Sequence, residues 1–104
     1  MATTSKALAR TAAATSNTTL YTVPNSSTTT VVTNVAVTNT ATSAATFTLN
    51  IDSVAIQSGS SVAANSTAYI DLKQVIPANA TPKTISGSAS ATTVNFHISG
   101  VEIV

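Results

Sequence analysis

The chain has 104 residues and a formal net charge of +1, and only 7% of its residues are charged. Ordinary soluble domains carry roughly 25% charged residues, so the polar surface here is built mainly from hydroxyl and amide groups. The length fits one domain with a modest core, and the near-neutral charge predicts that the protein binds neither nucleic acid nor an anionic membrane.

Two absences narrow the class of protein further. The sequence has no Cys, so it forms neither disulfides nor a Cys-ligated zinc site. No run approaches the roughly 18 apolar residues of a membrane span, and the N-terminus lacks the apolar segment of a signal peptide. We therefore expect a protein that is made in the cytoplasm and stays soluble until it meets a partner. A surface so poor in charge suits a component of an assembly.

The first element in chain order is residues 1–16, which we interpret as an N-terminal arm before a single domain at residues 17–104. The segment is rich in Ala and Thr, and Lys6 and Arg10 are its only charged residues. Residues 6–10 fit either a short edge strand or a helical turn. The arm either packs on its own domain or lies across a neighbouring subunit. The second alternative makes Lys6, Leu8 and Arg10 candidate interface residues.

The central stretch, residues 28–51, contains the strongest β signal. Apolar and Thr side chains alternate over residues 31–37 and again over residues 47–51, and such alternation with a period of two is typical of half-buried strands. β-Branched Val and Thr favour a pleated strand over a helix. The sequence therefore predicts two strands joined by a short polar turn, as a hairpin or a tight corner. A strand at residues 18–23, closed by Pro24, precedes them.

The second half of the chain continues the pattern with shorter strands. A tight turn at Asp52 and Ser53 leads into a strand at residues 54–56, and a break follows at residues 58–61. We expect strands at residues 66–73 and 83–87, separated by a loop at residues 76–82 that two prolines stiffen. In the last strand, Val101 and Ile103 are out of phase with the apolar residues before them. This shift predicts a β-bulge at residues 99–100.

About eight short strands with turn residues between them, and no convincing helix, predict an all-β fold, namely an antiparallel β-sandwich of jelly-roll or Ig-like type. We expect Tyr21 and Tyr69 to lie partly outside the core. The predicted core consists of Leu20, Val23, Val35, Val37, Phe47, Leu49, Ile51, Val54, Ile56, Ile70, Leu72, Ile85, Phe96, Ile98, Val101 and Ile103.

The ionisable residues predict no catalytic or metal centre. The single histidine, His97, lies on the strand face opposite Phe96 and Ile98, where a solvent-facing or interface role is expected. The three carboxylates fall on different strands or turns, without the spacing of a calcium site and without a second histidine for zinc. We therefore expect a protein that is not an enzyme and that binds no cofactor and no metal.

Several segments together carry a resemblance to a known group of proteins. They are Lys6-Ala-Leu-Ala, Leu20-Tyr-Thr-Val-Pro24, Thr30-Val-Val-Thr-Asn-Val-Ala-Val-Thr-Asn39, Ala44-Ala-Thr-Phe47, Ala63-Ala-Asn-Ser-Thr67 and Gly100-Val-Glu-Ile103. In this order they resemble small structural proteins of tailed bacteriophages, such as phages of cyanobacteria and other aquatic bacteria. The loop at residues 75–83, with its two prolines, departs from that resemblance, since a simpler turn is expected there.

The resemblance implies a β-sandwich virion protein, and specifically a head decoration or cement protein on the capsid surface. Its partners would be the major capsid protein and neighbouring copies of itself, as a trimer or another homo-oligomer. Two other classes stay open: a tail, neck or fibre-tip component, and a carbohydrate-binding β-sandwich module with Tyr21 and Tyr69 as its only candidate platforms. The residues expected at an interface are Lys6, Leu8, Arg10, Tyr21, Tyr69 and His97.

Overall fold

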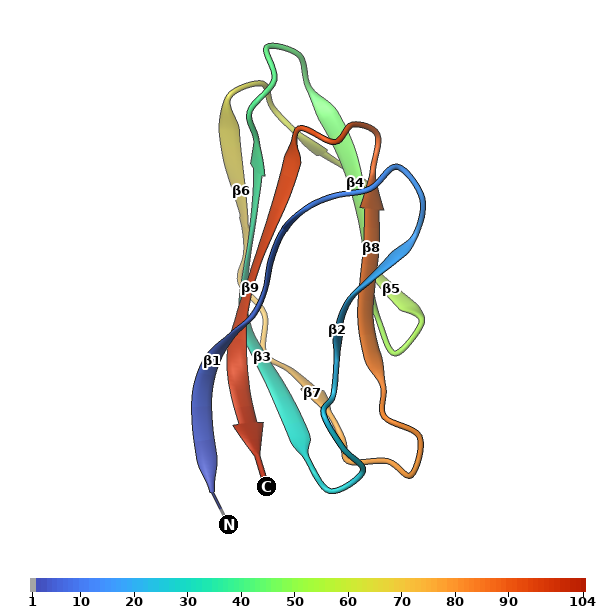
Figure 1. The fold of residues 1–104 in the computed structure, drawn as a ribbon. Coiled ribbons are helices and arrows are strands. Elements are labelled where there is room, and N and C mark those ends of the chain that lie inside the picture. Colours follow the sequence, from blue (N-terminus) through green and yellow to red (C-terminus); the bar gives the residue numbers. More distant parts are fainter. Residues whose placement is uncertain (1) are drawn as a thin grey trace.

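The computed structural model describes residues 2–104, which form nine β-strands (Figure 1). No helix within this range is long and apolar enough to cross a membrane. The strands are β1 (Thr3–Ala12), β2 (Thr18–Thr22), β3 (Thr29–Asn39), β4 (Ala45–Ile51), β5 (Val54–Val62), β6 (Ser66–Ile70), β7 (Gln74–Ile76), β8 (Thr84–Ala89) and β9 (Val94–Ile103).

The strands form two antiparallel sheets that face each other (Figure 1). The five-stranded sheet has the order β1-β9-β3-β6, with β7 also paired to β3, and the four-stranded sheet has the order β2-β8-β4-β5. Because β6 and β7 both pair with β3, they act as one interrupted strand. Counted in this way, β1 pairs with β9, β2 with β8, β3 with the interrupted strand β6 and β7, and β4 with β5. This nested pairing is the topology of a jelly roll, so the predicted antiparallel β-sandwich is confirmed.

The core lies between the two sheets and is built from inward-facing aliphatic side chains. Val35 and Val37 on β3 and Leu49 on β4 are almost completely buried, as their alternation predicts. Phe47 and Phe96 meet edge to face, with ring centroids 6.1 Å apart and an interplanar angle of 72°. The central stretch is a corner, because β3 belongs to one sheet and β4 to the other.

Within the N-terminal segment, residues 2–16 belong to the sandwich. β1 runs antiparallel to β9 from the pair Thr3 and Ile103 to the pair Ala12 and Asn95, and it forms an edge of the five-stranded sheet. Leu8 points inward and is buried in the core. Of the two alternatives for this segment, the structure shows packing on its own domain. The segment folds as a strand because its neighbour β9 supplies backbone partners that no sequence pattern within residues 1–16 reveals.

The bulge predicted at residues 99–100 is wrong. The side chains of β9 alternate inward and outward along the whole strand, and the extra residue lies in its two neighbours, at Leu8 on β1 and at Thr33 on β3. Both register shifts occur opposite Ser99. Val101 and Ile103 therefore lie on the outer side of the sheet and are only partly buried. Their expected core place is taken by Gly100 and Glu102, which face inward.

Other boundaries differ from the predicted ones for similar reasons. The stretch at residues 58–61 does not interrupt the strand, because β5 continues through Gly59, which has a φ of 59°. β6 ends at Ile70, and Ile76 is a fully buried residue of β7, so the proline-containing loop begins after it. Val54, expected in the core, is 67% exposed at the start of an edge strand.

Candidate interaction face

The outer side of the five-stranded sheet is a continuous surface formed by β1, β9, β3, β6 and β7. We call it the outer face. The backbone register aligns Arg10 with His97, His97 with Ala36, and Ala36 with Tyr69. Cross-strand partners share one face of a sheet, so these residues form one transverse row. Arg10, Tyr69 and His97, three residues expected at an interface, therefore lie together, and all three are exposed.

A second transverse row on the outer face is apolar. Val101 of β9 is aligned with Val31 of β3, and Val31 is aligned with Val75 of β7. Val75 is 59% exposed, whereas Val31 and Val101 are partly buried by their neighbours. Ile103 continues the apolar surface two residues along β9, on the same side. The row is thus a small hydrophobic strip on a sheet whose other outward residues are mostly Thr, Ser, Ala and Asn.

The outer face is nearly free of charge. Arg10 is the only charged residue among the outward positions of these strands, which are Thr3, Ser5, Ala7, Arg10, Ala12, Thr29, Val31, Asn34, Ala36, Thr38, Thr67, Tyr69, Val75, Asn95, His97, Ser99, Val101 and Ile103. The two salt bridges within residues 2–104 join Lys6 to Glu102 and Lys83 to Asp52, away from this face. A partner can therefore cover the outer face with little desolvation of ions.

Two residues expected at an interface are instead buried within the domain. Leu8 is packed in the core beneath β1, and Tyr21 points from β2 into the space between the sheets. The expectation that Tyr21 lies partly outside is wrong, because its hydroxyl has inward-facing polar partners on the other sheet. Lys6 stays exposed at the rim, where its ammonium group contacts Glu102 at 3.3 Å.

The partners of Tyr21 form a small polar cluster between the sheets. The hydroxyl of Tyr21 donates to Glu102 Oε2 at 2.5 Å and lies 2.8 Å from Thr30 Oγ1. Burial, together with the hydrogen bond to the Glu102 carboxylate, raises the pKa of Tyr21 to about 12, since both favour the neutral phenol. The cluster ties β2 of one sheet to β3 and β9 of the other, at the end where the two chain termini lie (Figure 1).

Replacing Tyr21 with Phe is expected to lower the free energy of unfolding by about 1–2 kcal/mol, because it removes the hydrogen bond to a partly buried carboxylate. Because the pKa of Tyr21 is raised in the folded state, the unfolded chain loses the proton first. The wild-type protein therefore loses stability as pH rises from about 10 towards 12. Denaturant titrations over this pH range should show a shallower loss in the Phe variant. If the free energy of unfolding fell equally with pH in the two proteins, the raised pKa of Tyr21 would be contradicted.

The apolar strip was missed at the sequence level. The sequence pattern predicts Val101 and Ile103 in the core, and its alternation over residues 31–37 predicts Val31 on the same strand face as Val35. A signal was present, since uninterrupted alternation from Phe96 through Ile98 places Val101 on the outer side without any bulge. What the sequence lacks is the position of the extra residue, which lies in the neighbouring strands.

The polar groups of the outer face show no assembled chemical site. His97 is exposed and pairs with no carboxylate within the described part of the chain. Residues 2–104 contain no group of three or more His, Cys, Asp or Glu side chains that could hold a metal ion. What the arrangement offers is a sheet surface for contact, with hydroxyl and amide groups around an apolar strip.

Comparisons with known proteins give one structural similarity. No protein-family model and no curated protein sequence matches the chain. Among solved structures, a chain from the structure of infectious bursal disease virus Gx strain superimposes with a TM-score of 0.49 and 13% sequence identity. The superposition covers 97% of this chain and 30% of that chain, so this protein spans less than a third of the viral chain's length.

Proposed function

We propose that this chain is a virion structural protein, and specifically a capsid decoration protein of a tailed bacteriophage. In this proposal it is made in the host cytoplasm, binds the major capsid protein and neighbouring copies of itself on the capsid surface, and catalyses no reaction. The sequence resemblance supports the phage assignment. The jelly-roll fold is compatible with it, since such folds occur in viral capsids, although they also occur in lectins and other proteins.

The outer face is the observation that carries the proposal. It presents a broad sheet surface whose strands carry a single outward charge, an apolar strip at Val31, Val75 and Val101, and an exposed aromatic ring at Tyr69. Two further charged residues, Asp71 and Lys73, lie in the segment between β6 and β7. Interface cores are depleted in charged residues and enriched in aromatic ones, whereas ordinary soluble surfaces are rich in charge. Such a face fits stable contact with a protein shell better than permanent exposure to solvent.

The carbohydrate-binding alternative is weakened by the position of the aromatic residues. Tyr21, Phe47 and Phe96 are buried, which leaves Tyr69, at 75% exposure, as the only exposed aromatic side chain of residues 2–104. A sugar platform formed by two tyrosines is therefore not present. A glycan array that shows no binding is the expected result.

Replacing Val75 with Lys is expected to weaken binding to phage heads by about tenfold or more, because the variant would bury an unpaired charge in the contact. Val54→Lys is the matched control, since Val54 is also an exposed valine but lies on β5 in the other sheet. Binding is measured by co-sedimentation with heads of the phage that carries the gene, stripped of this protein. If both variants lost head binding equally, or if neither lost it, the outer face would not be the surface that contacts the capsid.

Cryo-electron microscopy of the intact particle tests the location independently of any variant. We expect density for this jelly roll over the capsid shell, with the outer face towards the major capsid protein or a neighbouring copy. Density at the portal vertex, neck or tail alone would replace the decoration role with a tail or neck role. Absence of the protein from the particle would overturn both roles.

A further inference from the structure

A cavity opens at the edge of the sandwich where β5 faces the segment that joins β6 to β7. Its volume is about 250 Å³, and its lining consists of Ile56, Gln57, Ile70, Asp71, Leu72 and Gln74. β6 ends at Ile70, and pairing with β3 resumes only at Gln74. The cavity therefore lies beside this interruption, and none of its lining residues is an outward position of the five strands that form the outer face.

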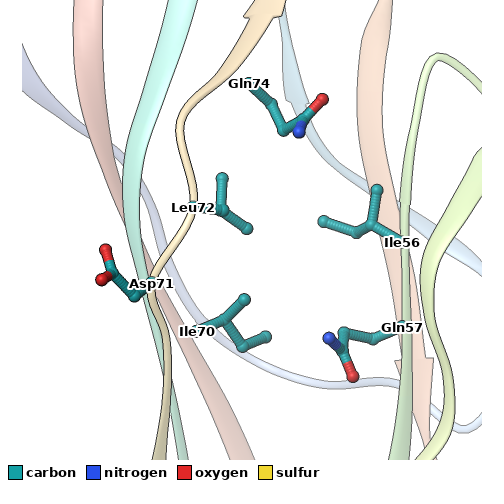
Figure 2. A pocket seen from close by; sticks show the side chains of 6 residues that line it. All are labelled: Ile56, Gln57, Ile70, Asp71, Leu72 and Gln74. Carbon is teal, nitrogen blue, oxygen red and sulfur yellow. The ribbon is translucent and has the colours of Figure 1, made fainter.

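The base of the cavity is apolar. Figure 2 shows that Ile56 of β5 points across the gap towards Ile70 and Leu72. These three side chains are partly buried and pack against the core, so the apolar base of the cavity is held by the hydrophobic interior. A cavity of about 150 Å³ with apolar walls is large enough to bind benzene. The space here therefore has room for an aromatic ring or a branched aliphatic side chain.

The ends of the cavity are marked by two amide groups. The chain contains only two glutamines, Gln57 and Gln74, and both line this cavity (Figure 2). The Gln57 carbonyl oxygen accepts a bond from Ser60 Oγ, which leaves its NH₂ group without a partner in residues 2–104. The Gln74 amide makes no hydrogen bond in the same range. A primary amide offers both donors and an acceptor, which is the complement of a peptide group.

The strands on both sides of the cavity also have free backbone edges. β5 is the outer strand of the four-stranded sheet, and β6 and β7 are the outer strands at one side of the five-stranded sheet. Residues 71–73 lie between β6 and β7 and have no paired strand partner. Edge strands with unpaired N–H and C=O groups accept an added extended segment, and nearby pockets then select its side chains.

A negative charge stands beside the cavity. Asp71 is exposed, its carboxylate points away from the cavity in Figure 2, and the salt bridges of residues 2–104 involve Asp52 and Glu102 instead. A bound segment that places a basic residue next to its inserted apolar side chain would meet this carboxylate. Asp71 can therefore pair with a basic residue of a bound segment, whereas Lys73, which is also exposed two residues further along the chain, has the opposite charge.

We propose that this cavity binds an extended polypeptide segment of a partner protein. One side chain of leucine or phenylalanine size enters the space between Ile56 and Leu72, and the amides of Gln57 and Gln74 hold the segment's backbone. A lysine or arginine of the segment pairs with Asp71. The site is separate from the outer face and does not require that the protein be part of a virion.

The test uses the whole chain and a short acetylated and amidated peptide of sequence Thr-Lys-Leu-Thr-Val-Thr. The two glutamine side-chain amides give their own NMR signals, which report directly on the cavity. We expect both signals to shift saturably with this peptide. A peptide with Ala in place of Leu should bind about tenfold more weakly, and a peptide with Glu in place of Lys should also bind more weakly.

Variants of the protein separate the cavity from the rest of the surface. Leu72→Trp fills the cavity and is expected to abolish the shifts, and Gln74→Ala, an exposed substitution that leaves the core untouched, should weaken binding. His97→Ala alters the outer face on β9, which lies between β1 and β3 and not at the edge beside the cavity, and it should leave peptide binding unchanged. Unmoved glutamine signals with all three peptides, or equal binding by the Gln74→Ala variant and the wild type, would overturn the proposal. Particle binding through the outer face would stand in either case.

Discussion

Replacing Asn39 with Asp is expected to destabilise the fold by about 3 kcal/mol or more at neutral pH, because it places an unpaired carboxylate in a site with no access to water. Asn39 is 0% exposed at the end of β3. Its NH₂ group donates to the carbonyl oxygens of Ser43 at 2.8 Å and of Val62 and Ala63 at 3.4 Å. A carboxylate there would face three acceptors and could donate to none.

The other side of the same amide explains why the effect should spread beyond β3. Asn39 Oδ1 accepts bonds from the backbone N–H of Ala41 and from Thr93 Oγ1. One side chain therefore joins the turn after β3 to the turns that follow β5 and precede β9. All three turns lie at the end of the sandwich away from the termini (Figure 1). Loss of the amide should loosen this end as a unit.

Denaturant unfolding of Asn39→Asp beside Asn34→Asp measures the effect. Asn34 is an exposed residue of the same strand, so the control makes the same chemical change without burial. Burial raises the pKa of the new carboxyl at position 39 above its unfolded value, so stability should be partly regained as pH falls from neutral towards about 4, the pKa of Asp in the unfolded chain. Equal stability of the two variants at neutral pH would show that the Asn39 network contributes little.

Alternation along single strands was enough to predict the class of fold. Val35 and Val37 on β3, and Phe47 and Leu49 on β4, lie in the core as expected, because a period of two depends only on local strand geometry. The positions of the bulges could not be predicted in this way. A one-residue slip between two strands can be accommodated in either of them, and here Leu8 and Thr33 absorb it in the strands beside β9.

The candidate site was predicted only as separate residues. The sequence identifies Arg10 as part of an N-terminal arm, and His97 and Tyr69 as outward-facing residues, but the row that unites them depends on the register between strands that are distant in sequence. The same holds for Tyr21, whose partner Glu102 is 81 residues away along the chain. The edge cavity depends on where the pairing of β3 with β6 ends, which no local pattern encodes.

Replacing Gly100 with Val is expected to destabilise the protein by about 3 kcal/mol or more, because the close approach of three strands leaves no space for a side chain. Gly100 is buried on β9 and does not have a positive φ, so backbone strain is not the reason that glycine is needed. A Cβ atom there would overlap the carbonyl oxygen of Val31 and would come within 2.8 Å of Leu8 Cδ1. Both neighbouring strands bulge beside this point.

Gly59→Ala is the informative comparison for this prediction. Gly59 has a φ of 59°, and no atom lies within 4 Å of the position that a Cβ atom would take there. Gly59→Ala should therefore lower the free energy of unfolding by only about 1 kcal/mol, which is the cost of placing a residue with a Cβ atom at a positive φ. Thermal or denaturant unfolding should rank Gly100→Ala as more destabilising than Gly59→Ala. The opposite order would mean that the strands around Gly100 move apart easily.

A second substitution separates the two contacts that exclude a side chain from position 100. The side chain of Leu8 can be shortened, whereas the carbonyl oxygen of Val31 is part of the β3 backbone and is fixed by its pairing with β9. Adding Leu8→Ala to Gly100→Ala removes only the contact with Leu8, so it should restore at most the part of the lost stability that is due to that contact. The double variant should therefore remain much less stable than the Leu8→Ala variant alone. If the double variant is as stable as the Leu8→Ala variant alone, the backbone of β3 can move to make room for the side chain. The tight packing of β9 between its neighbours would then not be the reason that glycine is required here.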